Sequence, residues 1–501
     1  MNKVMNSKDS TRDKLRRTPL LFAALALAAL IVFAPCAAFA ERGRRALTDQ
    51  ELDMAWTELA LKYQNPYASN DINNAPSADA LGSWWETLGD ERLTELIMTS
   101  LQNNRNLRAA MARVTEARAA LGISRSARLP WLDNVNSWTR NESSENSANR
   151  GAEMEITRLG IDASWEIDIF GGLKEKDRAA AATLEAEDAA LHAAWVTLSS
   201  EVALNYLSLR TLQDRLEIAR RNLALQEETR DMLKSLYEAG LRDSLALSQA
   251  QYTVDQTRAG IPPLRASIEA VMNGLAILAG LVPGSLEEIL NEPGALPEPS
   301  SVNLVGIPAD AVRQRPDIRS AERALAAQSS RKRSAELDRL PRFTLVGSIG
   351  LESLSIGSLF AGDSFGFSFG PRITLPIFHG ESIRRNIEVQ SAREEQLLAA
   401  YEGAVLGAVS EVRDALAANA QELERNESLK SGIAAAQNAL AVANDKYRSG
   451  LTDFSNVIGA QQALLSLEDQ YTVSRGQMTS NIVRVFKALG GGWAPLYSPE
   501  F

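Results

Sequence analysis

The chain has 501 residues, only 6% of them aromatic, and its formal net charge is −10. An acidic balance without a basic block excludes nucleic acid as an expected partner. The length exceeds that of one ordinary domain, and a composition rich in alanine and leucine with long proline-free stretches favours a helix-rich rod.

The N-terminus has the three parts of a secretory signal. A basic segment is followed by an apolar run at 20–32 and by an A-x-A cleavage motif at 38–40. We therefore expect cleavage between Ala40 and Glu41, so that 1–40 is a signal peptide. A membrane anchor is the alternative, but the apolar run is shorter than the ~20 residues that a membrane span needs.

The single cysteine, Cys36, lies inside this segment. The mature chain is then expected to contain no thiol, which excludes disulfides and cysteine metal sites. Lipidation of Cys36 is the competing interpretation, although Pro35 stands where lipidation motifs have a small residue. No later stretch resembles a transmembrane helix, so we expect a periplasmic, released or β-anchored outer-membrane protein.

An internal duplication with an offset near 210 residues determines the expected architecture. We expect a periplasmic segment at 41–79, two copies at 80–284 and 301–493, a Pro/Gly-rich linker at 285–300, and a tail at 494–501. The ordered matches are Asn106-Leu107-Arg108 with Asp317-Ile318-Arg319, Arg128-Leu129-Pro130 with Arg339-Leu340-Pro341, Ile169-Phe170 and Gly172 with Ile377-Phe378 and Gly380, and Tyr237, Gly240, Leu241 and Asp243 with Tyr447, Gly450, Leu451 and Asp453.

Each copy is expected to begin with a helix and to continue with two strands. The alternation of apolar and polar residues predicts strands at about 130–142 and 155–170, and again at 342–352 and 364–378. Pooled from several subunits, the strands would close a barrel with one face toward lipid and the other toward water. A small soluble sheet packed on helices remains the alternative. The polar face carries Arg158, Asp162, Glu166, Asp168 and Glu352, and the apolar face carries Trp165, Phe343, Phe365, Phe367 and Phe369.

A long helical hairpin completes each copy. A heptad seam in residues 173–236, with Asn205 as its polar member, predicts a helix packed along its length against a partner. The tips lie near Gly240 and Gly450, where glycine is typical of a helix C-cap. We expect the return helix of the first copy to break or kink at Pro262-Pro263.

The motifs in this order resemble the TolC-like outer-membrane factors, in the branch associated with resistance–nodulation–division pumps. They comprise Ser83-Trp84-Trp85, Leu88-Gly89-Asp90, Leu129-Pro130, Asp168-Ile169-Phe170-Gly171-Gly172, Tyr237 to Asp243, Arg315-Pro316-Asp317-Ile318-Arg319, Leu375-Pro376-Ile377-Phe378, Lys446-Tyr447 with Gly450, and Ala488 to Trp493.

The resemblance implies a mainly α protein with membrane β-structure: a homotrimer whose twelve strands form one outer-membrane barrel, continued by a periplasmic α-helical tunnel. It implies an inner-membrane pump and a periplasmic adaptor, with outer-membrane lipid around the barrel. The adaptor-docking tips would be Gly240, Leu241, Arg242, Asp243, Gly450, Leu451, Thr452 and Asp453. Relatives often place an aspartate nine residues after the second tip glycine, but Gly459 stands there. Asp243 and Asp453 become the entrance-gate candidates, with helix capping as their alternative role.

The expected function is passive conduction of small molecules as the outer-membrane channel of a tripartite efflux pump. The alternatives are the duct of a type I protein secretion system and a non-channel periplasmic coiled coil. We expect no cofactor and no catalysis, because His192 and His379 neighbour no convincing acid or nucleophile and no phosphate-binding glycine loop is present.

Overall fold

The computed structural model describes residues 82–146, 148, 150–241, 243–297 and 314–492. All of them belong to one compact unit, which spans residues 65–501. The expected cleavage site at Ala40 and Glu41, the candidate lipidation site Cys36 and the tail at 494–501 lie outside the described residues.

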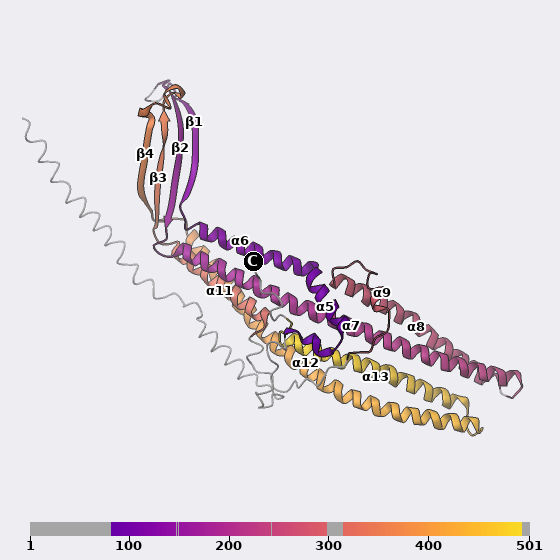
Figure 1. Cartoon of the computed structure of the whole chain (residues 1–501). Helices are drawn as coiled ribbons and strands as arrows, with labels where there is room; N and C mark the ends of the chain where they lie inside the picture. The colour runs from indigo at the N-terminus through magenta and orange to yellow at the C-terminus, as the bar shows by residue number, and fades with distance from the viewer. Residues whose placement is uncertain (1–81, 147, 149, 242, 298–313, 493–501) are drawn as a thin grey trace, which may run out of the picture. The chain divides into compact units, whose positions relative to one another are not determined.

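Both copies contain a helix, two strands and a long helical hairpin in the same order (Figure 1). The long helices are matched in length, 67 residues each for α7 and α12 and 35 each for α8 and α13. The first copy comprises η2 (Trp84–Leu88), α5 (Glu91–Asn103), α6 (Arg105–Ser126), β1 (Trp131–Glu142), β2 (Glu153–Ile167), α7 (Gly172–Glu238) and α8 (Ser244–Leu278). The second comprises α11 (Pro316–Leu337), β3 (Arg342–Ser353), η3 (Ile356–Ser358), η4 (Gly362–Ser364), β4 (Phe365–Thr374), α12 (Ser382–Arg448) and α13 (Phe454–Ala488), and α9 (Glu287–Leu290) lies in the linker between the copies.

The first helix of copy one is divided at Asn104, where we expected a single helix. Asn104 has an extended backbone, and its side chain accepts a hydrogen bond from the Leu107 amide at 3.0 Å. Its amide group also donates to the carbonyl of Leu278 at 2.8 Å. Asn104 therefore starts α6 and holds that start against the end of α8.

Copy two has an equivalent contact between a helix start and a helix end, made by an arginine in place of the asparagine. Arg315, which precedes α11, donates to the carbonyl of Ala488 at the end of α13, over 2.9 Å. Gly280 and Gly490, both with positive φ, follow the two helix ends; a Cβ atom would collide with Asn103 at Gly280 and would crowd Arg315 and Pro316 at Gly490. The duplication is thus preserved in packing as well as in sequence.

Helix α7 lies inside the helical layer. At ~1.5 Å per residue it is about 100 Å long, and it contacts α6, α8, α11 and α13. The expected seam is largely buried, as at Val202 and Leu209, and the side chain of half-buried Asn205 donates to the carbonyl of Glu201 in its own helix. The role of Asn205 in fixing the register stays a prediction.

Helix α8 runs without interruption through Pro262 and Pro263. We expected a break or kink there because each proline removes an amide donor. Both prolines lie on the exposed side of the helix, so water can satisfy the carbonyl groups that lose their partners. Exposure explains why the helix does not end at the prolines.

The two hairpins meet closely along α7 and α13. A Cβ atom on Gly476 would overlap the hydroxyl group of Thr211, so only glycine allows this approach. Next to it Arg215 donates two hydrogen bonds to the carboxylate of Asp469, at 2.7 and 3.1 Å. Among the described helices, none has the length and apolarity that a membrane crossing would need.

The four strands form one antiparallel sheet in the order β1-β2-β3-β4. Strands β2 and β3 belong to different copies, so the central pairing joins the two halves of the duplication. Strands β1 and β4 are the two edges of the described sheet.

Candidate conduit: sheet faces and hairpin tips

One face of the sheet is apolar and open to its surroundings. In the observed registers Leu351 lies opposite Phe365, and Ile349 lies opposite Phe367. Phe365, Phe367 and Phe369 are 58%, 78% and 72% exposed. A row of exposed phenylalanines on one sheet face is costly in water and suits a lipid environment.

The other two residues expected on this face lie where the sheet meets the helices. The ring of Phe343 packs against Phe170 at 6.2 Å between centroids. The indole nitrogen of Trp165 donates to the carbonyl of Arg128, 2.8 Å away. These two side chains connect the sheet to the helical layer in addition to facing outward.

The opposite face of the sheet is polar. Arg158 donates to Asp162 over 2.6 Å, and the register places Arg158 opposite Glu352. Glu166 lies opposite Thr344 on the same face. Also on this face, the hydroxyl groups of Ser348 on β3 and Ser368 on β4 are hydrogen-bonded at 2.8 Å. The arrangement gives a hydrated, charged surface on the side away from the phenylalanines.

Two glycines on the polar face were not singled out by the sequence pattern. The register sets Gly160 opposite Gly350. A Cβ atom on Gly350 would collide with the carbonyl of Leu159 and with the backbone of Gly160. Only glycine permits this approach of β2 and β3, and it clears the surface along which Arg158 reaches Asp162.

Asp168 does not belong to the polar sheet face, because β2 ends at Ile167 rather than near residue 170. Its carboxylate accepts hydrogen bonds from the amides of Leu173 and Lys174, at 3.1 and 2.8 Å. Asp168 therefore stabilises the start of α7, where a negative charge is favourable. We correct its expected role from lumen residue to helix cap.

Both hairpin tips have the same backbone. Gly240 and Gly450 have φ values of 71° and 70°, and the next amides, of Leu241 and Leu451, donate back into the preceding helix at 2.9 and 2.8 Å. This is the Schellman pattern of a helix end. It leaves both leucine side chains exposed at the extremities of the hairpins.

The two gate candidates differ. The Asp243 carboxylate accepts from the Ala246 amide at 3.2 Å and so caps α8. The Asp453 side chain makes no capping bond, and beside it the Thr452 hydroxyl accepts from the side chain of Asn456 at 2.6 Å. Arg242 lies outside the described residues.

A small apolar cluster joins the two tips. The rings of Tyr447 and Phe454 lie 5.2 Å apart, and Leu233 of the other hairpin is fully buried beside them. Further from the tips, the side chain of Gln462 donates to the hydroxyl of Tyr252 at 3.3 Å. The two hairpins therefore contact each other at several levels, from the tips to the Arg215–Asp469 pair.

The linker between the copies is held by a buried arginine that the sequence did not indicate. Arg210, 1% exposed, donates to Gln213 and to the carbonyl of Glu292, both at 2.8 Å, and to the hydroxyl of Tyr206 at 3.0 Å. The Tyr206 hydroxyl in turn donates to Asp90 over 2.7 Å. The network fastens the described part of the linker and the start of α5 to α7.

The two histidines occupy unlike places. His192 lies in α7 beside Trp195, at 5.4 Å between rings, and burial lowers its pKa. His379 lies in the connection between β4 and α12. Within the described residues no group of three or more His, Cys, Asp or Glu side chains could hold a metal ion.

The chain matches one protein family along most of its length. The family described as outer membrane efflux protein matches residues 96–281 and 307–491. The toluene efflux pump outer membrane protein TtgF of Pseudomonas putida is 32% identical over 420 residues, which cover 83% of this chain and 86% of that protein. The cation efflux system protein CusC of Escherichia coli is 27% identical over 462 residues, covering 88% and 97%.

Solved structures give the same result for the fold. The outer-membrane channel OprN superimposes with a TM-score of 0.80 at 31% identity, covering 86% of this chain and 98% of that chain. A structure of CusC gives a TM-score of 0.74 at 28% identity, covering 86% and 99%.

Proposed function

This chain belongs to the outer membrane efflux protein family, and we propose that three copies of it close one barrel and one helical tunnel to form a continuous duct. Its role as the outer-membrane channel component of an efflux pump follows from the family and from relatives of the same function. The expected resemblance, the mainly helical channel fold with a smaller β part and the outer-membrane location are thereby confirmed. The trimer and its twelve strands stay part of the proposal.

The two-faced sheet is the observation that carries the trimeric duct. Four strands with an exposed phenylalanine face and a charged face cannot bury a core by themselves. Twelve strands from three copies would turn the phenylalanines toward lipid and enclose the polar face around water. The barrel interior would then contain Arg158, Asp162, Glu166 and Glu352.

The duct is expected to prefer cations. The polar face presents the carboxylates of Asp133, Asp162, Glu166 and Glu352 against the exposed guanidinium of Arg372 and the paired ones of Arg158 and Arg342. A lumen lined by an excess of one sign concentrates the opposite ion. Conduction itself is passive, and the energy comes from the pump.

The partners are an inner-membrane pump and a periplasmic adaptor. Exposed leucines at both tips, Leu241 and Leu451, give the adaptor an apolar contact, and the cluster around Tyr447 couples the two tips. Relatives are named for the export of toluene and of cations, which favours small molecules as cargo over the protein cargo of a type I system.

Single-channel conductance of the purified protein in planar bilayers, with its mass in detergent, tests the duct. We expect a trimer with discrete, cation-selective and mostly closed conductance. A monomer without membrane activity would leave a periplasmic helical rod and would remove the proposed function.

The docking role of the tips needs a separate test. Leu241→Asp combined with Leu451→Asp should abolish drug or solvent resistance while leaving the trimer mass and the conductance unchanged. Both leucines are exposed, so the change leaves the hairpin fold intact. Normal resistance in this variant would exclude docking through the tips.

A further inference from the structure

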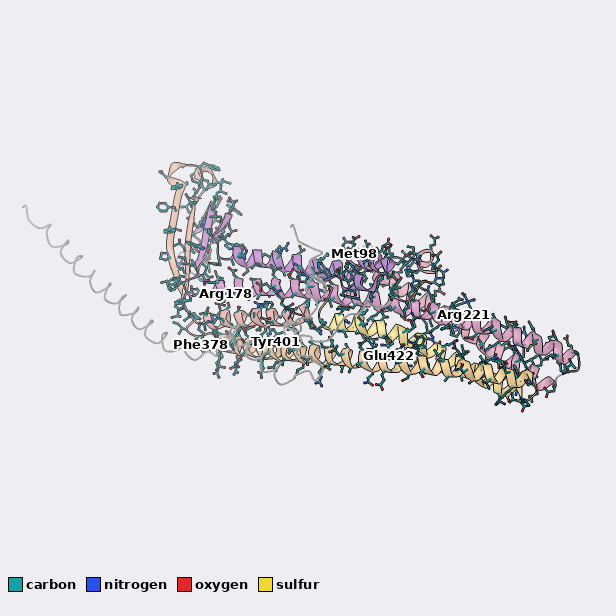
Figure 2. All side chains as sticks on the ribbon, turned by 60° about the horizontal axis from the view of Figure 1, so that its bottom comes forward. Met98, Arg178, Arg221, Phe378, Tyr401 and Glu422 are labelled. Atoms are coloured by element: carbon teal, nitrogen blue, oxygen red, sulfur yellow. The ribbon has the colours of Figure 1, made fainter. Side chains whose placement is uncertain are left out.

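The two connections at the far end of the sheet differ in character. Figure 2 shows Phe378 at the near end, where the strands give way to the long helices, so the proposed duct would place the far end at the cell surface. Residues 143–152, between β1 and β2, contain no large apolar side chain. Residues 354–364, between β3 and β4, include Leu354, Ile356 and Phe360, which are 69%, 69% and 79% exposed. A group of exposed apolar side chains marks a contact surface.

A network of serines gives the apolar connection a fixed shape. The Ser358 hydroxyl is hydrogen-bonded to the hydroxyl groups of Ser353 and Ser355, at 2.7 and 3.1 Å. The Ser364 hydroxyl donates to the Ser358 carbonyl at 2.7 Å. Leu359, next to Ser358, is 2% exposed. The connection therefore buries one of its large apolar residues and leaves the other three exposed.

The connection is attached to the apolar side of the sheet. Ser353, the strand residue of the network, follows Leu351 by two residues and so shares its face. Thr157 lies directly opposite Ser353 on that face. Only 7% of Thr157 is exposed, whereas 47% of Ile161, nearer the helices on the same face, is exposed. This pattern of burial indicates that the connection folds toward the apolar side of the sheet.

The apolar face of the strands is by itself short for a membrane. From Phe343 to Leu351 the strand rises about 26 Å, which at the usual tilt corresponds to about 20 Å across a bilayer. Outer-membrane barrels carry an apolar band of about 25 Å. Leu354 comes three residues after Leu351, so the exposed residues of the connection begin where the band would otherwise end.

We propose that Leu354, Ile356 and Phe360 lie against the acyl chains of outer-leaflet lipid and anchor the outer rim of the barrel in the membrane. This inference rests on the proposed duct and extends its lipid-facing surface beyond the strands. The patch continues the apolar face at Phe365, the first residue of β4. Residues 354–364 include a single charged residue, Asp363, so the connection offers little to a charged partner.

The lumen is the less favourable place for these side chains. The polar face ends at Glu352, and Arg158 lies directly opposite Glu352 on β2. A connection folded over this face would set its apolar side chains against both charged groups. The charges would lose water without gaining a hydrogen-bonding partner, which is costly.

Spin labels in the full-length protein test this contact in liposomes of phosphatidylethanolamine and phosphatidylglycerol. A nitroxide is attached at Ile356→Cys or at Phe360→Cys. Phe367→Cys is the control on the apolar face, and Asn146→Cys is the control in the polar connection, where the side chain is exposed. Oxygen concentrates in the bilayer and a water-soluble nickel complex stays outside it, so their effects on the relaxation of the label separate lipid from water. The unsubstituted chain, whose only cysteine is Cys36, controls for labelling elsewhere.

The labels at Ile356→Cys and Phe360→Cys should be relaxed several-fold more by oxygen than by the nickel complex, as at Phe367→Cys, and the order should reverse at Asn146→Cys. Stronger relaxation by nickel at the first two positions, with Phe367→Cys still in lipid, would overturn the anchor and leave the duct standing. Weak relaxation by both reagents would place these side chains inside the protein and would overturn the anchor equally. Access of nickel to Phe367→Cys would remove the lipid-facing sheet, and with it both the duct and the anchor.

Discussion

Helices α7 and α12 are equal in length and equivalent in the duplication, yet they bury different side chains. Tyr206 and Arg210 of α7 are 0% and 1% exposed. Their counterparts 210 residues later are Leu416, which is half-buried, and Ala420, which is exposed. Helix α7 is surrounded by helices of its own chain, whereas α12 contacts α11 and α13. The difference leaves part of α12 open in the single chain, where the proposed trimer would place a neighbouring copy.

The largest effect is expected from removing Arg210, whose buried hydrogen bonds have no counterpart in α12. Arg210→Ala leaves the backbone carbonyl of Glu292 and the side-chain oxygen Oε1 of Gln213 without their donor and opens a cavity. We expect a loss of about 3–5 kcal/mol in the free energy of unfolding. Urea unfolding followed by circular dichroism measures it.

Arg413→Ala is the matched control, because Arg413 is exposed on α12. Its effect should stay within about 0.5 kcal/mol. Equal effects of the two substitutions would mean that the network around Arg210 adds nothing to stability.

The next prediction concerns alkaline pH. Burial raises the pKa of the Tyr206 hydroxyl to about 12, and its hydrogen bond to Asp90 acts in the same direction. An unfolded tyrosine ionises near pH 10. The stabilising contribution is therefore complete below pH 10 and is lost as the pH rises toward 12, by at most about 3 kcal/mol.

Melting temperatures measured from pH 9 to pH 12 check this dependence. Tyr206→Phe should remove this part of the decline, whereas Tyr252→Phe, at an exposed tyrosine of α8, should keep it. A decline of the same steepness in both variants would show that Tyr206 is not the group responsible.

A third prediction sharpens the comparison between the return helices α8 and α13. Gly476 of α13 contacts Thr211, but its counterpart in α8 is Ala266, which is exposed. Gly476→Ala forces the two helices apart and should cost about 1–3 kcal/mol. Gly459→Ala, where a Cβ atom would meet nothing within 4 Å, should instead stabilise the protein by about 0.5–1 kcal/mol. Urea midpoints of the two variants should move in opposite directions.

Local patterns in the sequence were enough to predict the strands and the hairpin tips of this fold. The alternation of apolar and polar residues predicted strands near those observed, and Gly240 and Gly450 predicted the tips, because a positive φ at a helix end favours glycine. The duplication also predicted that the two hairpins would match.

Features that depend on a neighbour far along the chain could not be predicted in the same way. Asp168 continues the alternation of β2, but the strand ends before it because the pairing with β3 ends at Phe343. Arg210 looks like any charged residue of a long helix until the linker covers it. Gly350 is tied to its place by the backbone of β2, a contact that no local pattern contains.

The smallest expected effect concerns helix capping, which differs between the two tips. Asp243 caps α8 through the Ala246 amide, whereas Asp453 makes no such bond to α13. Asp243→Ala should destabilise the start of α8 by about 1 kcal/mol, while Asp453→Ala should change the start of α13 little. Hydrogen exchange of the first helical turns measures both.

If either aspartate also closes the entrance, its substitution should raise the open fraction of the channel in bilayers. A leak caused by Asp453→Ala without faster exchange would assign gating to Asp453, and faster exchange without a leak in Asp243→Ala would limit Asp243 to capping.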